Sequence, residues 1–365
     1  MPDQVAAFEK FLINSKHKAQ RYESTEAGFA EFLHIARSVA EAEQKPKKNK
    51  SNAPNTYVDL ATPSRLNACA FSQDGVDCIA LFKGSVEVIT SLFNHILADP
   101  ATFEGHGDIS LETKPPLRGS LIPDTAWMDA EERRPADSLR RTIADRLRQS
   151  AYQFLSAHEV RHIRGGHVQY LKKHSSALFI EEIESLSHLS PDEIITHQTL
   201  EMNADAFAIG QGLTNLLAIV GKLDEGHVKP AFSQLLELWL YAVCAFFRLI
   251  AHERPFRLEE IALKVHPPAR ARLLWSLQTV QTWEHCGLLP LTSDEIFAIA
   301  GRVASRIEAD IATITGTPVD LAGALTATDP EVDKRLEVLN TRYEQLRPEL
   351  EELSYSTTPV YKWNN

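Results

Sequence analysis

The sequence predicts a mainly helical α+β fold with one small β-sheet. Apolar residues recur at the three- and four-residue spacing of helices through most of the chain, and capping signals precede several of these segments. One stretch changes to short apolar runs around an Asp-Gly turn, which indicates a β-hairpin. With 365 residues, of which 44% are hydrophobic, the chain is long enough for two modest domains or one elaborated domain.

The N-terminal region is predicted to form two helices within residues 4–43, because each half carries a stripe of apolar side chains. A polar stretch with a basic run at 45–50 follows, and such composition is typical of a solvated linker. We therefore expect an N-terminal helical appendage at 1–43, a basic polar linker at 44–57, a main domain at 58–290 and a C-terminal helical extension at 291–365.

The predicted hairpin consists of two apolar segments, Leu66–Phe71 and Val76–Phe82, joined by Ser72–Gly75. Asp-Gly in this position favours the tight turn that connects two antiparallel strands. A helix should follow and stop at Asp99-Pro100. Residues 101–136 are rich in Gly and Pro, so we expect a long irregular loop there.

A long helix is predicted to begin near Asp137-Ser138 and to end at Gly165-Gly166, where residues tolerant of positive φ take over. Its buried face is expected to carry Leu139, Ile143, Leu147, Ala151, Phe154, His158 and His162. The two histidines thus continue an apolar stripe, which favours an internal site over a surface one.

Capping boxes at Ser190–Glu193 and Thr292–Glu295 open two further helices. The second should run to about Gly316. Apolar residues at near-heptad spacing over 336–353 are interrupted by Pro348, so we expect a helix packed on the body rather than a long coiled coil.

Composition limits the partners of the protein. The formal net charge of −11 argues against nucleic acid as the main partner. The most apolar stretch, Leu238–Phe247, is far shorter than the ~20 residues of a membrane span, so we expect a buried core helix and no membrane span. No signal peptide is evident at the N-terminus, and a cytoplasmic location is expected. The oligomeric state stays open.

The cysteines agree with that location. Cys69, Cys78, Cys244 and Cys286 are widely spaced and lie in apolar contexts. We expect four buried thiols in a reducing compartment, because neither their number nor their spacing indicates a disulfide framework or a Cys-type zinc site.

The segment His158-Glu159-Val160-Arg161-His162 carries the most chemical information. Residues four apart share a helix face, so both imidazoles can reach one metal ion. Zinc is the expected ion because it accepts neutral imidazoles, and its catalytic sites keep one position open for water. Glu159 follows the first ligand, where a carboxylate could deprotonate that water. The alternative is an amphipathic helix that happens to contain two histidines.

A zinc site of this kind needs a third protein ligand, and two segments offer one. His167 follows the Gly165-Gly166 break, although a histidine there more often packs or hydrogen-bonds beyond the helix end. Glu201 and Asp205 share a face of the later helix, so Glu201 could bind the metal while Asp205 orients a ligating histidine. A solvent-facing acidic pair is the alternative. His197, one turn before Glu201, could support the site or serve as a spare ligand, and we favour a structural role.

Three short motifs together resemble the gluzincin peptidases. Glu201 to Asp205 is similar to their Glu-x-x-Ala-Asp segment, and His266 to Arg272 is similar to the His-Pro-x-x-x-x-Arg segment of a group that includes the CAAX prenyl endopeptidases and HtpX-type proteases. This resemblance, which extends over roughly residues 66–275, implies a zincin-like metallopeptidase domain with helical extensions. The soluble phage-exclusion proteases of the Lit type share the same broad plan.

The resemblance implies roles for individual residues. His158, His162 and Glu201 would bind one Zn²⁺ per chain, and Glu159 would act as general base. His266 would stabilise the oxyanion, unless it merely begins a helix, and Arg272 would pair with Asp205 or Glu201. The expected function is a zinc-dependent endopeptidase acting on a protein or peptide substrate, with phage defence implied only by the Lit-type likeness. The alternative is a non-proteolytic regulatory or partner-binding protein on a zincin scaffold.

Overall fold

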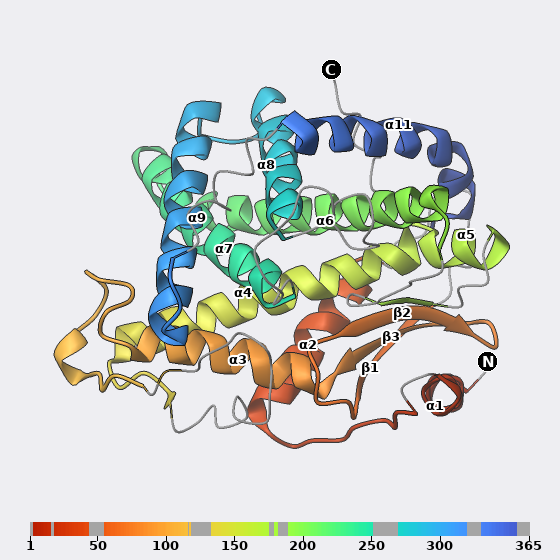
Figure 1. The fold of residues 1–365 in the computed structure, drawn as a ribbon, viewed down its shortest axis with the longest axis horizontal. Coiled ribbons are helices and arrows are strands. Elements are labelled where there is room, and N and C mark those ends of the chain that lie inside the picture. The colour runs from red at the N-terminus through yellow and green to blue at the C-terminus, as the bar shows by residue number, and fades with distance from the viewer. Residues whose placement is uncertain are drawn as a thin grey trace.

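The structure, a computed structural model, describes residues 3–15, 18–43, 55–115, 117, 133–174, 179–181, 189–250, 269–319 and 330–355. In chain order its first elements are α1 (Gln4–Asn14), α2 (Ala27–Ala42), β1 (Thr56–Ala61), β2 (Ala68–Gln73), β3 (Val76–Phe82), α3 (Lys83–Ala98) and the 3₁₀ turn η1 (Ile109–Leu111). The later elements are α4 (Ser138–Arg164), α5 (His167–His174), β4 (Phe179–Glu181), α6 (Pro191–Val220), α7 (Glu225–Ile250), α8 (Ala269–His285), α9 (Ser293–Thr315) and α11 (Pro330–Leu353). The protein is mostly helical with one small mixed sheet, as an α+β fold requires (Figure 1).

The sheet has the strand order β1-β3-β2-β4. β2 and β3 form the predicted antiparallel hairpin, and β1 pairs with β3 in parallel. Asp74 and Gly75 turn the hairpin with φ of 51° and 81°, as its tight turn demands. β1 was not among the predicted strands and begins at Thr56, within the predicted linker at 44–57. The division of the chain into independent units stays a prediction.

Both faces of the sheet are buried. Side chains alternate between the two faces along each strand, and consecutive residues of β3 are all buried. One face carries Cys69, Phe71 and Cys78 and is covered by α1, where Phe11 stacks on Phe71 at 3.6 Å between ring centroids. The other face belongs to the main hydrophobic core, which extends from Phe29 in α2 to Leu350 in α11. The sheet therefore lies between α1 on one side and the larger helical body on the other (Figure 1).

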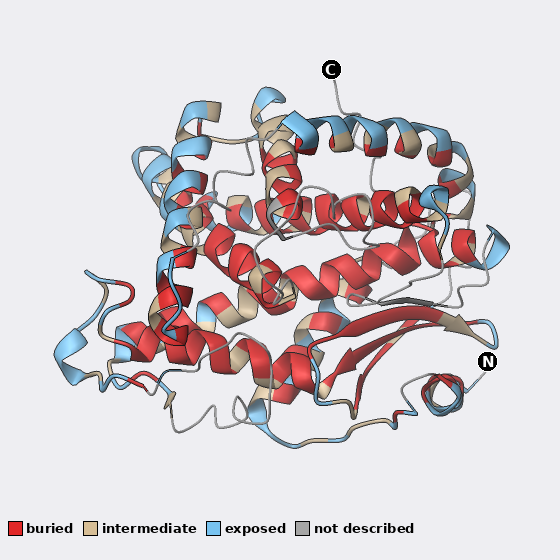
Figure 2. Ribbon diagram, in the orientation of Figure 1, coloured by how far each residue is buried: buried red, intermediate tan, exposed pale blue. Residues whose placement is uncertain are grey.

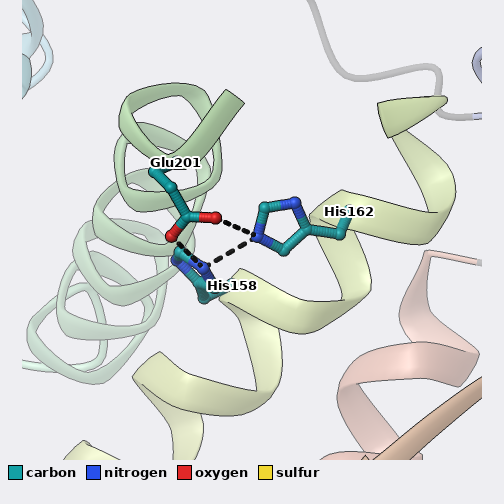
Figure 3. A group of neighbouring side chains, drawn as sticks. All are labelled: His158, His162 and Glu201. Atoms are coloured by element: carbon teal, nitrogen blue, oxygen red, sulfur yellow. Dashed lines mark hydrogen bonds and ion pairs between the residues drawn. The ribbon is translucent and has the colours of Figure 1, made fainter. Parts of the chain in front are cut away.

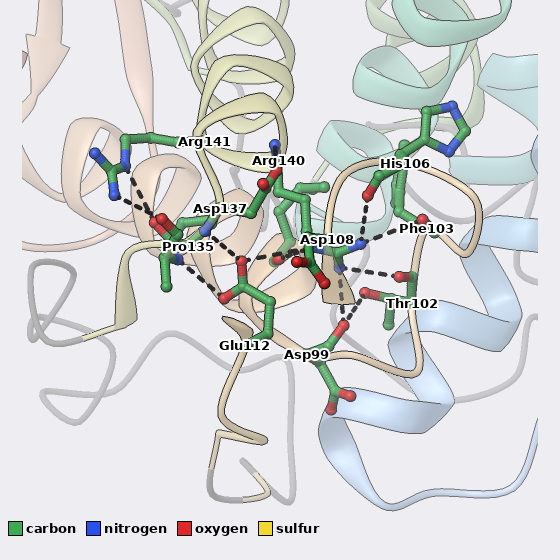
Figure 4. A network of polar contacts seen from close by, with 12 residues as sticks. Asp99, Thr102, Phe103, His106, Asp108, Glu112, Pro135, Asp137, Arg140 and Arg141 are labelled. Atoms are coloured by element: carbon green, nitrogen blue, oxygen red, sulfur yellow. Dashed lines mark hydrogen bonds and ion pairs between the residues drawn. The ribbon is translucent and has the colours of Figure 1, made fainter. Parts of the chain in front are cut away.

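The start of α4 is held by Arg140, whose side chain is fully buried. It donates hydrogen bonds of 2.7 to 3.2 Å to the carbonyls of Leu97, Asp99, Thr102, Phe103 and His106 (Figure 4). These carbonyls lie at the end of α3 and in the loop after it, where the helix no longer supplies backbone donors to its last carbonyl groups, and one guanidinium donates to all five. The N-terminal turn of α4 is thereby joined to α3.

Several helix boundaries confirm the predictions. Asp137 caps α4, and Ser190 and Thr292 form the capping boxes of α6 and α9. Gly316 ends α9 in the left-handed conformation. Pro348 lies inside α11 without ending it, and α11 packs on the body through a buried stripe that includes Leu339.

Two predictions about burial are wrong. Leu139 is 51% exposed, because it lies in the first turn of α4, before the point at which the apolar stripe of this helix reaches the core at Ile143. Cys286 is exposed at the end of α8, whereas Cys69, Cys78 and Cys244 are buried as expected.

By length and composition α7 could cross a membrane, but 61% of its most apolar stretch is buried inside the fold. The predicted core segment at 238–247 lies in this helix, and most of its residues are buried.

Candidate metal centre

The candidate centre lies between α4 and α6, two long helices that cross the middle of the molecule (Figure 1). Both helices are buried on nearly all sides at their centres, as Figure 2 shows by colour. In α4 the buried run includes the whole segment from His158 to His162, and in α6 it includes Glu201 and Asp205. Burying so many polar groups costs free energy unless they bind one another or a metal ion.

His158, His162 and Glu201 form a group that could hold a metal ion (Figure 3). The Nε2 atoms of the two histidines are 2.9 Å apart. Of the two Glu201 carboxylate oxygens, Oε2 lies 3.4 Å from His158 Nε2, and Oε1 lies 3.3 Å from His162 Nε2. All three side chains are at most 2% exposed.

These separations can be compared with those of a zinc site. Zinc–nitrogen and zinc–oxygen bonds of about 2.0–2.1 Å at tetrahedral angles place two ligand atoms roughly 3.3 Å apart. The two histidine–carboxylate distances, 3.3 and 3.4 Å, agree with that value, and the histidine–histidine distance of 2.9 Å is somewhat shorter. The donor set of two imidazoles and one carboxylate therefore fits a divalent metal in both chemistry and spacing.

Asp205 supports the first histidine. Its Oδ1 lies 2.9 Å from His158 Nδ1, on the ring atom that points away from the metal group. Arg272 of α8 donates to both oxygens of Asp205, at 2.7 and 2.8 Å. Burial alone would raise the pKa of Asp205, but the charge and hydrogen bonds of Arg272 outweigh it and lower that pKa. An ionised Asp205 then holds the Nδ1 proton of His158 and leaves Nε2 for a metal.

The second histidine has a different support. His162 Nδ1 lies 3.0 Å from Nδ1 of His167, the first residue of α5. The Nε2 of His167 lies 3.2 Å from Asn203 Oδ1, which also accepts a hydrogen bond of 2.8 Å from Arg161. Burial holds the pKa of His162 well below its usual range and lowers that of His167 to about 3. Both rings are therefore neutral near pH 7, as metal ligation by His162 requires.

The remaining candidates lie as follows. Glu159 is 1% exposed and directly follows His158 on α4. His167 and His197 are buried but do not belong to the metal group. His266 lies outside the described residues, so its predicted role stays a prediction.

Sequence reasoning missed Asn203 and Tyr343. Asn203 lies between the two acids of the Glu201–Asp205 segment. An amide at this position is not part of any motif that the sequence analysis used, so its role could not be predicted. Its position two residues after Glu201 turns it away from the metal group, toward Arg161 of α4 and His167 of α5. Tyr343 of α11 is buried and lies near the Asn203 side chain. No local pattern in the sequence could have revealed this proximity between distant segments.

Comparison of the chain with protein-family models, with curated proteins and with solved structures found no match in any of the three.

Proposed function

We propose that this protein is a zinc-dependent endopeptidase of the zincin type, with one Zn²⁺ per chain held by His158, His162 and Glu201. The observation that carries the proposal is the convergence of two imidazoles and one carboxylate at separations of 2.9, 3.3 and 3.4 Å. Two histidines and one glutamate are a ligand set of catalytic zinc, whereas structural zinc sites usually have four protein ligands. Zinc bound in such a set lowers the pKa of a water molecule to about 7 and polarises a carbonyl group.

Glu159 is the proposed general base. Its carboxylate belongs to the residue after His158 and lies in a buried setting, 1% exposed. A carboxylate in such a setting can accept the proton of the attacking water and pass it to the leaving amine. A site that only stores metal has no need of a base beside its first ligand. The proposal therefore assigns the chemistry to Glu159 and the binding to the three ligands.

Asp205 and Arg272 are the proposed supporting residues. Asp205 holds His158 in one tautomer, and Arg272 keeps Asp205 ionised. His266 remains the proposed donor to the oxyanion on the basis of the His-Pro-x-x-x-x-Arg likeness alone. A donor aimed at that oxygen typically contributes about 2.7–4 kcal/mol to the barrier reduction.

The proposed substrate is a protein or peptide met in the cytoplasm. The likeness to phage-exclusion proteases favours a role in phage defence, and the net charge of −11 makes nucleic acid an unfavourable partner. Substrate preference depends on side chains from several segments of the fold, so it is best found by experiment.

The proposal is tested by Glu159→Gln, which keeps the shape of the side chain and removes the base. The variant should retain zinc and lose proteolysis by about 10²–10⁴-fold. Wild type, the variant and the control Glu225→Gln, an exposed position at the start of α7, are incubated with cell lysate, and new peptide termini are counted by mass spectrometry.

Equal cleavage by Glu159→Gln and wild type would remove Glu159 from the mechanism. Wild type that binds zinc but generates no new termini would contradict the peptidase. A partner-binding protein on a metal scaffold would then be the better account.

A further inference from the structure

The His162 ring has contacts on both of its nitrogen atoms. Its Nε2 faces Glu201 at 3.3 Å, and its Nδ1 faces His167 at 3.0 Å. The two nitrogens of an imidazole point in different directions, so His167 lies on the side of the ring away from the ligand atoms. His167 is therefore placed to orient a ligand rather than to serve as one.

We propose that His167 is a positioning residue, which accepts a hydrogen bond from Nδ1 of His162 and so directs Nε2 of His162 toward the metal. This inference rests on the proposed metal centre and deepens it. A histidine that binds metal through Nε2 carries its proton on Nδ1. His167 must then accept at its own Nδ1, which places its proton on Nε2.

The next contact agrees with this assignment. His167 Nε2 lies 3.2 Å from the side-chain oxygen of Asn203. That atom must be the oxygen and not the amide nitrogen, because Arg161 Nε lies 2.8 Å from it and a guanidinium can only donate. His167 thus donates to an oxygen whose identity a second residue establishes. Every proton along the path from His162 to Asn203 has one consistent place.

Asn203 also lies near α11, the C-terminal helix, where Tyr343 is 2% exposed. The hydrogen-bonded path, which we call the relay, consists of His162, His167, Asn203 and Arg161.

The turn that delivers His167 is also clamped by the C-terminal end of α11. Gly166 has a φ of 80°, and a side-chain carbon there would lie 2.8 Å from Leu353 Cβ and 3.0 Å from the Ser354 nitrogen. Tyr355 N and Ser354 Oγ both donate to the carbonyl of Arg164, at 2.8 and 2.9 Å. The backbone before this turn is thus held by two hydrogen bonds, and the turn itself packs against the end of α11 immediately before His167.

The test compares His167→Leu, which removes the acceptor, with His167→Asn, whose side-chain oxygen can occupy the place of Nδ1. Zinc affinity is measured by competition with a chromophoric chelator, and the visible spectrum of the Co²⁺ form reports ligand geometry. His167→Leu should bind zinc about 10–100-fold more weakly and alter the cobalt spectrum. His167→Asn should recover most of both. The control is His95→Leu, which removes a buried histidine of α3 that the metal group does not include.

Wild-type affinity and spectrum in His167→Leu would overturn the proposal while leaving the metal centre intact. Failure of wild type itself to bind zinc or cobalt would overturn both. Should His167→Leu not fold, the ring ¹⁵N shifts of wild type give the answer directly. They should report the proton of His167 on Nε2 and that of His162 on Nδ1, and a His167 proton on Nδ1 would contradict the relay.

Discussion

Asp205 serves two partners at once. Its carboxylate lies 2.9 Å from His158 Nδ1 and accepts hydrogen bonds from Arg272 at 2.7 and 2.8 Å. Arg272 is 2% exposed, and its guanidinium lies over the Phe247 ring at 4.7 Å from the centroid. A buried guanidinium needs an opposite charge nearby, because isolated charges are costly in the interior. The same carboxylate therefore neutralises Arg272 and orients a proposed metal ligand.

Asp205→Asn should weaken zinc binding by about 10–100-fold, because an amide supports the His158 proton less strongly than a carboxylate. The variant should also be less stable, since Arg272 loses its counter-charge. Chelator competition measures the first effect and urea unfolding the second. Asp333→Asn, at an exposed site in the first turn of α11, is the matched control. Unchanged zinc affinity in Asp205→Asn would show that His158 is oriented by other groups.

Among the elements, α6 and α7 meet where the indole of Trp239 lies against Gly212. A methyl group on this residue would overlap the indole of Trp239, which is 4% exposed in the core. The indole occupies the space that a side chain at position 212 would need. Trp239 thereby packs α7 against the same helix that carries Glu201 and Asp205.

Gly212→Ala should lower the free energy of unfolding by about 1–3 kcal/mol through overpacking. Gly301→Ala in α9 is the matched control, since nothing lies within 4 Å of the added carbon there. That control should be stabilised by up to about 1 kcal/mol, because alanine favours a helix more than glycine does. Chemical denaturation of both variants measures the difference. Equal behaviour of the two would mean that Trp239 moves aside at no cost.

A buried pair joins α7 to α9. Tyr241 donates a hydrogen bond of 2.6 Å to Asp310, and burial raises the pKa of Asp310 to about 6 despite that bond and the nearby Arg306 and Arg140. Asp99 also faces the group and adds to the rise. A carboxyl whose pKa is higher in the folded state binds more protons there. Its favourable contribution is complete below the unfolded pKa, 3.8, and is lost as pH rises through about 6.

Asp310→Asn cannot ionise, so its stability relative to wild type should depend on pH. The variant should gain on wild type by up to about 1.4 kcal/mol per pH unit across that window and then level off. Urea unfolding of both proteins between acid and neutral pH gives the difference, and groups common to both cancel. A difference that is constant with pH would mean that Asp310 titrates normally in the folded protein.

At the scale of the whole molecule, the features that could be predicted from the sequence are those that a few neighbouring residues determine. The starts of α4, α6 and α9 could be predicted from their N-cap residues, Asp137, Ser190 and Thr292, because capping depends on residues within one turn. β1 escaped prediction because its pairing with β3 is parallel and follows from the fold around it. Leu139 was misplaced because periodicity gives a face but not the point at which the core begins.

The residues of the candidate site also fall into those that local sequence patterns predict and those that depend on contacts between distant segments. His158 and His162 share a helix face, so their joint role could be read from spacing alone. Glu201 and Asp205 needed a likeness to known motifs, since nothing local indicates that α6 would lie against α4. The contact of His167 with His162 depends on the turn at Gly166 and on α11, and neither the turn geometry nor the docking of α11 is encoded in a short motif.

Metal binding by the intact protein underlies every role proposed for the residues between α4 and α6. Zinc per chain should be measured by elemental mass spectrometry on wild type and on Glu201→Ala, with Glu225→Ala as an acidic control away from the site. We predict about one zinc in wild type and in the control, and much less in Glu201→Ala, because two histidines alone bind zinc weakly. Full zinc in Glu201→Ala would assign the third ligand elsewhere, and no zinc in wild type purified without chelator would contradict the metal centre itself.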